Sequence, residues 1–243
     1  MVTERSIALM KLVMLPGLDG TGLLFENLAQ ELSRNFEATI ISFEDVSGQS
    51  YQQQAAEVAD QLKNDRIFIV AESYSGPIAY ALTQLLKPNQ IAGIVFLASF
   101  ISRPSPIARM AHLIPSVLFK ENRFTRKSLT YFGFNSHYES QLISAVFNSI
   151  NTADKIKLKN RLHNIATLQK AHNIISIPVT YIRPSKDRLV SRQAVNDLAK
   201  NCINYNEVSV SGGHFIAQLK PKECAEVICK AVKLATRSGI DDI

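Results

Sequence analysis

The sequence lacks long apolar runs. No stretch of its 243 residues approaches the ~20 consecutive apolar residues that a membrane-spanning helix needs, so we expect no membrane span. The first residues, MVTERSIALMKLVMLPG, include charged side chains at positions 4, 5 and 11 and no small-residue cleavage site. They predict a first β-strand and not a signal peptide.

Cysteine is scarce, and its spacing does not fit a metal site. Cys202, Cys224 and Cys229 are the only three, and an odd number does not suit a disulfide framework. The sequence therefore favours a reduced, cytoplasmic protein. We expect neither a metal nor an organic cofactor.

Acidic residues are scarce in one segment. Between Ile101 and Ser176 there are eleven Lys or Arg but only three Asp or Glu, a net charge of +8, whereas the rest of the chain carries −2. The segment has helical spacing and no convincing strands. A second small helical domain is one interpretation. We favour a basic helical lid formed by residues 100–176, above the carboxyl ends of the strands, where open α/β sheets bind ligands.

What is present is an alternation of strands and helices. The apolar fraction of 46% fits a globular protein with a substantial core, and there are no internal repeats. Strand-like runs occur at 7–15, 37–43, 67–71, 91–99, 177–182 and 203–210. Helical patterns separate them at 24–34, 51–63, 76–86, 191–200 and 222–235. We predict an α/β fold, with residues 1–99 and 177–243 forming a mostly parallel sheet of about six strands and helices on both faces.

Ser73 interrupts this pattern between the strand IFIVA and a helix that begins near Gly76. A serine on a tight strand-to-helix turn is lifted above the edge of the sheet with its hydroxyl exposed. Such a turn needs small residues two positions before and after the serine, and Ala71 and Ser75 stand there in place of the usual glycines. AESYSG alone could be an ordinary turn, so the motif needs partners.

A glycine-rich loop, LPGLDGTG, closes the first predicted strand. At that position it can direct a backbone N–H toward Ser73, and acyl transfer needs two such donors where the carbonyl oxygen becomes negative. The N–H groups of Leu18 and Tyr74 are the candidates. A phosphate-binding loop is the alternative, although the Lys-Ser/Thr of a P-loop and the G-x-G-x-x-G pattern are both missing.

Asp187 and His214 follow the fifth and sixth predicted strands. A carboxylate at the first position can accept the Nδ1–H of a histidine, although alone it could be a surface ion pair with Lys186 or Arg188. The chain order Ser, Asp, His, with an insert between the first two, is the order that an α/β-hydrolase sheet requires. We predict Ser73 as nucleophile, His214 as base and acid, and Asp187 as the residue that orients His214.

The sequence resembles the α/β-hydrolase superfamily along essentially its whole length. PGLDG matches the oxyanion loop of that family, AESYSG its nucleophile elbow, KDRLVS its acid turn and GGHF its histidine loop. The resemblance implies the same triad, with Leu18 and Tyr74 as oxyanion donors. The loop departs from the family in having Pro16 where a histidine often precedes the first glycine, so the sequence shows no anchor for it.

Within the superfamily the chain is similar to small lid-bearing carboxylesterases, including the pimeloyl-acyl-carrier-protein methyl ester esterases of biotin synthesis. The basic lids of that group receive an acidic carrier, so the resemblance implies an acyl carrier protein or a small ester as partner. Solvated helix faces are the alternative for each cation. Nucleic acid is not expected, because no aromatic platform accompanies the charge. The predicted carrier contacts are Arg123, Arg126, Lys127, Lys155, Lys157, Lys159 and Arg161.

The sequence thus predicts a serine carboxylic-ester hydrolase that forms an acyl-enzyme. A carboxylesterase of other specificity, a thioesterase or an acyltransferase would use the same residues. A non-catalytic ligand receptor on the same fold is a further alternative. A dehalogenase is disfavoured, because its elbow carries an aspartate and this one carries Ser73.

Overall fold

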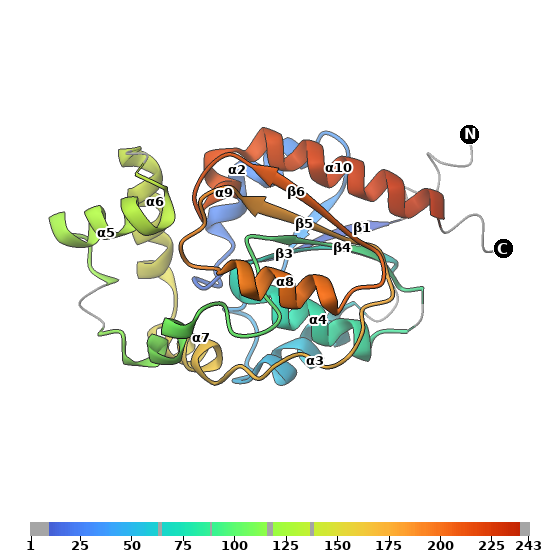
Figure 1. The fold of residues 1–243 in the computed structure, drawn as a ribbon, viewed down its shortest axis with the longest axis horizontal. Coiled ribbons are helices and arrows are strands. Elements are labelled where there is room, and N and C mark those ends of the chain that lie inside the picture. The colour runs from blue at the N-terminus through green and yellow to red at the C-terminus, as the bar shows by residue number, and fades with distance from the viewer. Residues whose placement is uncertain (1–9, 63–64, 88, 116–118, 137–138, 239–243) are drawn as a thin grey trace.

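A six-stranded sheet forms the centre of the molecule, and all its neighbouring strands are parallel (Figure 1). The computed structural model describes residues 10–62, 65–87, 89–115, 119–136 and 139–238. In spatial order the strands are β2 (Ala38–Ile40), β1 (Lys11–Leu15), β3 (Ile67–Glu72), β4 (Ile91–Leu97), β5 (Val179–Pro184) and β6 (Tyr205–Val210). The predicted α/β fold is confirmed, and residues 7–9 of the first predicted strand lie outside the described residues.

Burial explains which sequences became the central strands. Every residue of β3 (IFIVAE) and β4 (IAGIVFL) is buried, as near-continuous apolar runs predict for strands covered on both faces. The outer strands β2 and β6 keep partly exposed residues along their length. The carboxyl ends of β1 and β3 therefore lie deep inside the sheet, where a loop or turn is held firmly.

Helices cover both faces of the sheet and bury one apolar cluster on each (Figure 1). One face carries α2 (Glu26–Leu32), α9 (Ile216–Leu219) and α10 (Pro221–Ser238), and the other carries α3 (Tyr51–Gln61), α4 (Gly76–Leu85) and α8 (Arg192–Lys200). A short 3-10 turn, η1 (Leu23–Phe25), leads into α2. None of the helices described is both long and apolar enough to cross a membrane.

Between β4 and β5 the chain leaves the sheet and forms a helical insert, residues 100–176. Its elements are η3 (Pro106–Leu113), α5 (Arg123–Gly133), α6 (Ser140–Thr152) and α7 (Lys155–Thr167). Figure 1 shows these elements at the side toward which the arrowheads of β5 and β6 point. The insert therefore lies at the carboxyl edge of the parallel sheet, the edge at which α/β sheets place their sites.

Candidate active site

β3 ends in a sharp turn at Ser73. The φ angle of Ser73 is 47°, in the left-handed region that a non-glycine residue adopts only under strain. A 3-10 turn, η2 (Ser73–Ser75), continues directly into α4. The hydroxyl of Ser73 is thus raised above the sheet at the start of a helix, as a nucleophile elbow requires.

Ser75 and Gly76 hold this turn tight. The Ser75 hydroxyl donates to the carbonyl oxygen of Leu15 at 2.8 Å and also lies 3.0 Å from that of Glu72, so it joins the ends of β1 and β3. A Cβ on Gly76 would lie 2.0 Å from the carbonyl oxygen of Phe100, so only glycine fits there. Ser75 is therefore more than a small residue: its hydroxyl fastens the elbow.

Ser73, His214 and Asp187 form a continuous chain of hydrogen bonds. His214 Nε2 lies 2.9 Å from Ser73 Oγ, and His214 Nδ1 lies 2.9 Å from Asp187 Oδ2. The other oxygen of Asp187 accepts the backbone N–H groups of Leu189 and Val190 at 2.8 and 3.0 Å, which fixes the carboxylate. The three residues come from the ends of β3, β5 and β6 and meet at one edge of the sheet, as the sequence predicted.

Charge interactions among these hydrogen-bonded residues shift the pKa values of His214 and Asp187. Burial acts to lower the pKa of His214, but the charge and hydrogen bond of Asp187, with the charge of Glu72, outweigh it and raise the pKa. Burial acts to raise the pKa of Asp187, yet its contacts with His214 and the two backbone N–H groups lower it overall. Asp187 is therefore suited to stabilise an imidazolium that forms on His214.

The glycine-rich loop lies against the nucleophile. A Cβ built on Gly17 would be 3.8 Å from the Cβ of Ser73. The carbonyl oxygen of Gly17 accepts the N–H of Gly20 at 3.1 Å, which closes a turn. Since the peptide group is planar and trans, the N–H of Leu18 points opposite to that carbonyl, out of the turn. The loop can thus present the Leu18 N–H to an oxyanion, while the Tyr74 N–H lies in the elbow.

Comparison with solved structures identifies the fold. MenH from S. aureus has a TM-score of 0.75 at 14% identity, covering 93% of this chain and 94% of that one. A thermophilic esterase from Thermogutta terrifontis gives 0.74 at 14% identity, with 93% and 90% covered, and an esterase from Exiguobacterium antarcticum gives 0.72 at 14%, with 92% of each chain covered. The chain has the α/β-hydrolase fold. No protein-family model and no curated protein matches the sequence.

Arg161 is not a surface residue, and its predicted role as a carrier contact is wrong. Its side chain is buried, with Nε donating to the carbonyl oxygen of Leu18 at 2.8 Å. Nη2 donates to the carbonyl oxygen of Asp19 at 2.7 Å and to Glu44 at 3.0 Å. One sequence signal marks it: Arg161 lies three residues after Leu158 and one before Leu162, on the apolar stripe of α7.

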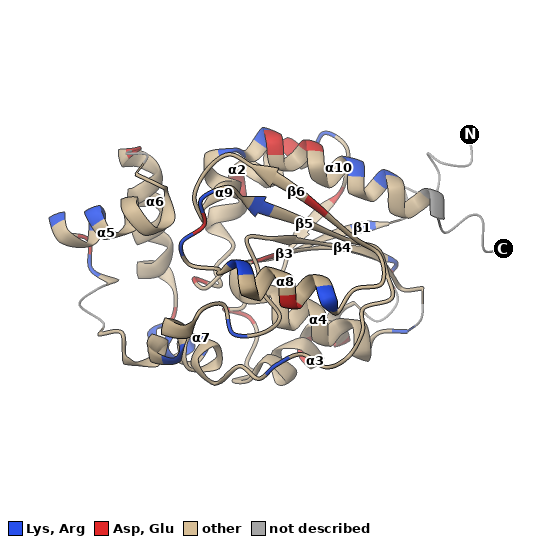
Figure 2. Cartoon of the chain, viewed as in Figure 1, with Lys and Arg blue, Asp and Glu red and all other residues tan. Residues whose placement is uncertain are grey.

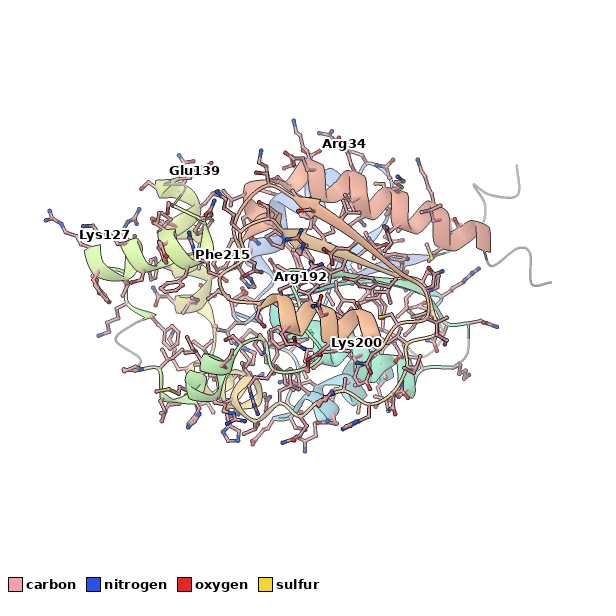
Figure 3. All side chains as sticks on the ribbon, in the orientation of Figure 1. Arg34, Lys127, Glu139, Arg192, Lys200 and Phe215 are labelled. Carbon is pink, nitrogen blue, oxygen red and sulfur yellow. The ribbon has the colours of Figure 1, made fainter. Side chains whose placement is uncertain are left out.

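The other predicted carrier contacts divide into two groups. Lys155 donates to the carbonyl oxygens at the end of α6, Lys157 donates to that of Glu44, and Arg126 pairs with Glu121. Arg123, Lys127 and Lys159 are exposed, and their side chains form no hydrogen bond or ion pair with any other described residue. Figure 3 shows Lys127 at the outer end of α5, pointing away from the sheet. These last three residues are the ones available to a partner.

Glu72 and Asp19 are two buried carboxyl groups that sequence reasoning did not assign. Both approach Gly17: a Cβ there would be 3.6 Å from Glu72 Oε2 and 3.8 Å from Asp19 Oδ1. Burial, with the charge of Asp19, raises the pKa of Glu72 to about 7, although Gln218 donates a hydrogen bond to it at 3.2 Å. A group that titrates near neutral pH therefore lies next to Ser73.

The end of α5 packs on the histidine loop. The backbone N–H of Phe215 donates to the carbonyl oxygen of Gly133 at 3.1 Å, and the ring of Phe215 stacks on Phe134 with centroids 5.0 Å apart. Arg188, next to Asp187, lies over the ring of Tyr131 at 4.0 Å. Figure 3 places Phe215 between the insert and the sheet. The insert therefore contacts the loops that carry His214 and Asp187.

Proposed function

We propose that this protein is a serine carboxylic-ester hydrolase that works through an acyl-enzyme. The observation that carries the proposal is the pair of 2.9 Å contacts that join Ser73 Oγ to His214 and His214 to Asp187, with the serine in a strained turn. Nucleophile, base and orienting acid within hydrogen-bond reach are the signature of nucleophilic catalysis. The esterase names among proteins of the same fold agree with it.

The geometry supports a two-step reaction. His214 Nε2 takes the proton of Ser73 Oγ while Oγ attacks the ester carbonyl carbon, and the imidazolium is stabilised by Asp187. The N–H groups of Leu18 and Tyr74 hold the negative oxygen of the tetrahedral intermediate. His214 then gives its proton to the departing alcohol, which leaves an acyl group on Ser73. Water, activated by the same histidine, attacks the acyl-enzyme and releases the carboxylic acid and free serine.

Substitution of the nucleophile tests this function. We expect Ser73→Ala to lower kcat on p-nitrophenyl butyrate by about 10⁴-fold or more, because no other group can form the acyl-enzyme. Ser209→Ala, which changes an exposed serine on β6 at the same edge of the sheet, should leave the rate unchanged. Retention of the wild-type rate in the Ser73 variant would refute the proposal.

The same residues would serve an acyltransferase or a thioesterase, and product analysis distinguishes these. A hydrolase yields mainly free acid when methanol competes with water, whereas an acyltransferase yields mainly the methyl ester. A ligand receptor would release no more than one equivalent of p-nitrophenol. We expect repeated turnover to free acid.

We further propose that the substrate is carrier-bound, as in the pimeloyl-acyl-carrier-protein methyl ester esterases. Arg123, Lys127 and Lys159 support this, since they are exposed on the insert and form no ion pair with the described residues. An acidic carrier would be drawn to this surface before its acyl chain reaches Ser73.

A further inference from the structure

The loop that carries Leu18 has no anchor in its own sequence, because Pro16 stands where related loops have a histidine. Within the described residues, its internal contacts are the Gly17–Gly20 hydrogen bond and those of the Asp19 carboxylate with Thr21. A short turn of this kind leaves the carbonyl groups of Leu18 and Asp19 to be fixed from outside.

Arg161 supplies that contact from 143 positions further along the chain. Its guanidinium donates to the carbonyl oxygens of both Leu18 and Asp19, at 2.8 and 2.7 Å. Because the guanidinium is planar and its N–H groups are fixed in direction, two such bonds orient two successive peptide groups of the loop. The N–H of Leu18 belongs to the preceding peptide group, whose carbonyl oxygen, that of Gly17, accepts from Gly20. All three peptide groups from Gly17 to Gly20 are therefore held, two by Arg161 and one by the turn itself.

Gly20 is shaped to admit this side chain. It has a φ of 73°, and a Cβ on it would lie 2.5 Å from Nη1 and 2.7 Å from Cζ of Arg161. A side chain at position 20 would therefore displace the guanidinium. The glycine-rich character of the loop serves the contact with Arg161 as well as the turn itself.

Stability alone does not favour an arginine at this position. Its side chain is only 1% exposed, and Glu44 is its single carboxylate partner among the described residues. Nη1 is buried without a hydrogen bond to any of them. A buried donor without a partner is destabilising, so the arrangement indicates a role other than stability.

A second element of the insert holds the same loop. Ser149 of α6 donates to the carboxylate of Asp19 at 2.6 Å, and the hydroxyl of Thr21 donates to the same oxygen at 2.6 Å. Asp19 is therefore bound through its carbonyl group by Arg161 of α7 and through its side chain by Ser149. Both contacts come from the insert.

We propose that Arg161 is the positioning residue of the oxyanion loop, acting through the carbonyl groups of Leu18 and Asp19 to keep the Leu18 N–H directed at the reacting carbonyl oxygen. This inference rests on the proposed serine hydrolase function. If Arg161 has this role, its loss reduces stabilisation of the transition state and leaves ground-state binding of the ester unchanged.

Arg161→Met tests the proposal, with Lys157→Met as the matched control. Lys157 lies on the same helix, and its Nζ donates to the carbonyl oxygen of Glu44. It forms no hydrogen bond with the described residues of the loop. In Arg161→Met we expect kcat on p-nitrophenyl butyrate to fall about 10- to 100-fold with KM unchanged. Lys157→Met should keep the wild-type kcat. Arg161→Lys retains the charge but not the planar guanidinium with its paired donors, so its kcat should lie between those of the wild type and Arg161→Met.

A trifluoromethyl alkyl ketone gives a readout that a structural role would not change. It forms a tetrahedral adduct with the serine, and the oxygen of this adduct occupies the oxyanion hole, whereas the matching methyl ketone only fills the pocket. We expect Arg161→Met to lower the affinity for the fluorinated ketone by the same factor by which kcat falls. The affinity for the methyl ketone should not change. If Arg161→Met does not fold, Arg161→Lys is measured in the same way.

Equal loss of affinity for both ketones, or a lower Tm with wild-type kcat, would overturn the role of Arg161. Either result would leave the proposed function standing if Ser73→Ala is inactive. If wild-type hydrolysis does not depend on Ser73, the proposed function itself fails. The two failures are therefore distinguishable.

Discussion

Glu72 lies one residue before the nucleophile, and its carboxyl group has no cation as partner among the described residues. The groups around it are Asp19, which opposes its ionisation, Gln218 and the backbone N–H of Gly17, which donate to it, and His214, whose charge favours it. Burial raises the pKa of the Cys224 thiol, and the charge of Glu72 adds to this effect. Glu72 therefore couples to His214 through charge and not through contact.

This coupling predicts a change in the pH dependence of Glu72→Gln. The negative charge of Glu72 raises the pKa of His214, and hydrolysis needs a neutral histidine. Removal of the charge lowers the pKa of His214, so the acidic limb of kcat/KM should move to lower pH. A pH–rate profile measures the shift, and Glu57→Gln, at a half-buried carboxyl on α3 that accepts from Ser47, should show none. An unchanged limb, or a shift to higher pH, would contradict the coupling.

Residue by residue, local sequence predicted the parts of the site that depend on strand ends. Ser73, Asp187 and His214 each follow an apolar run, and parallel strands bring such ends to one edge. Their catalytic role stays a prediction. No local pattern predicts the surroundings of Glu72, because Asp19 lies on a loop and Gln218 on a helix, both distant in sequence, and no spacing rule relates them.

At the scale of elements, the side chain of Tyr74 joins three of them. From the elbow, its hydroxyl donates to Gln54 of α3 at 2.9 Å and accepts from Asn164 of α7 at 3.0 Å. Burial raises the pKa of Tyr74 to about 12, so the hydroxyl stays protonated as this network needs. The ring lies 4.8 Å from that of Tyr51. A residue proposed for its backbone N–H therefore also ties the insert to the core.

Tyr74→Phe separates these two roles. Loss of the hydroxyl leaves the amides of Gln54 and Asn164 each without one buried partner, so the free energy of unfolding should fall by about 1–3 kcal/mol. The backbone N–H is unchanged, and kcat should stay close to the wild-type value. Urea denaturation and ester hydrolysis measure the two effects. A large loss of kcat with unchanged stability would show that the hydroxyl has a role in the reaction.

α7 shows where prediction from charge was limited. Counting Lys and Arg treated residues 155–161 as one basic run, but a helix distributes such a run over several faces. The predicted role of Arg161 failed because the insert packs this face of α7 on the loop that carries Leu18, and only tertiary structure reveals that contact. The short helix α9 was also missed as a separate element, because its four residues carry no periodic pattern of their own.

For the whole molecule, the distribution of charge is the feature with the clearest functional consequence. Figure 2 shows basic segments on α5, at the left edge of the view and on the side of the insert away from the sheet. Arg123 and Lys127 lie on this helix and are exposed. Surface charges of this kind steer association and have little effect on chemistry after binding.

The double variant Arg123→Glu/Lys127→Glu tests the carrier-bound substrate. We expect kcat/KM on a pimeloyl-acyl-carrier-protein methyl ester to fall severalfold, while hydrolysis of p-nitrophenyl butyrate is unchanged, because only the carrier meets these residues. The wild-type rate on the carrier substrate should decrease with added salt. Lys200→Glu, at the end of α8, is a charge-reversal control on the core. Equal activity of the double variant and the wild type on the carrier ester would remove the support for a carrier.

The fit between Gly20 and Arg161 limits how this protein can be engineered. Exchange of whole lids between relatives is a natural route to new substrate specificity, and it treats the lid as a module. Here the insert also holds the loop that carries Leu18, so on the proposed role of Arg161 a chimera with a foreign insert would lose its oxyanion geometry with its old specificity. A functional graft must therefore retain an arginine at position 161 and a hydroxyl at position 149, and vary only the outer surface.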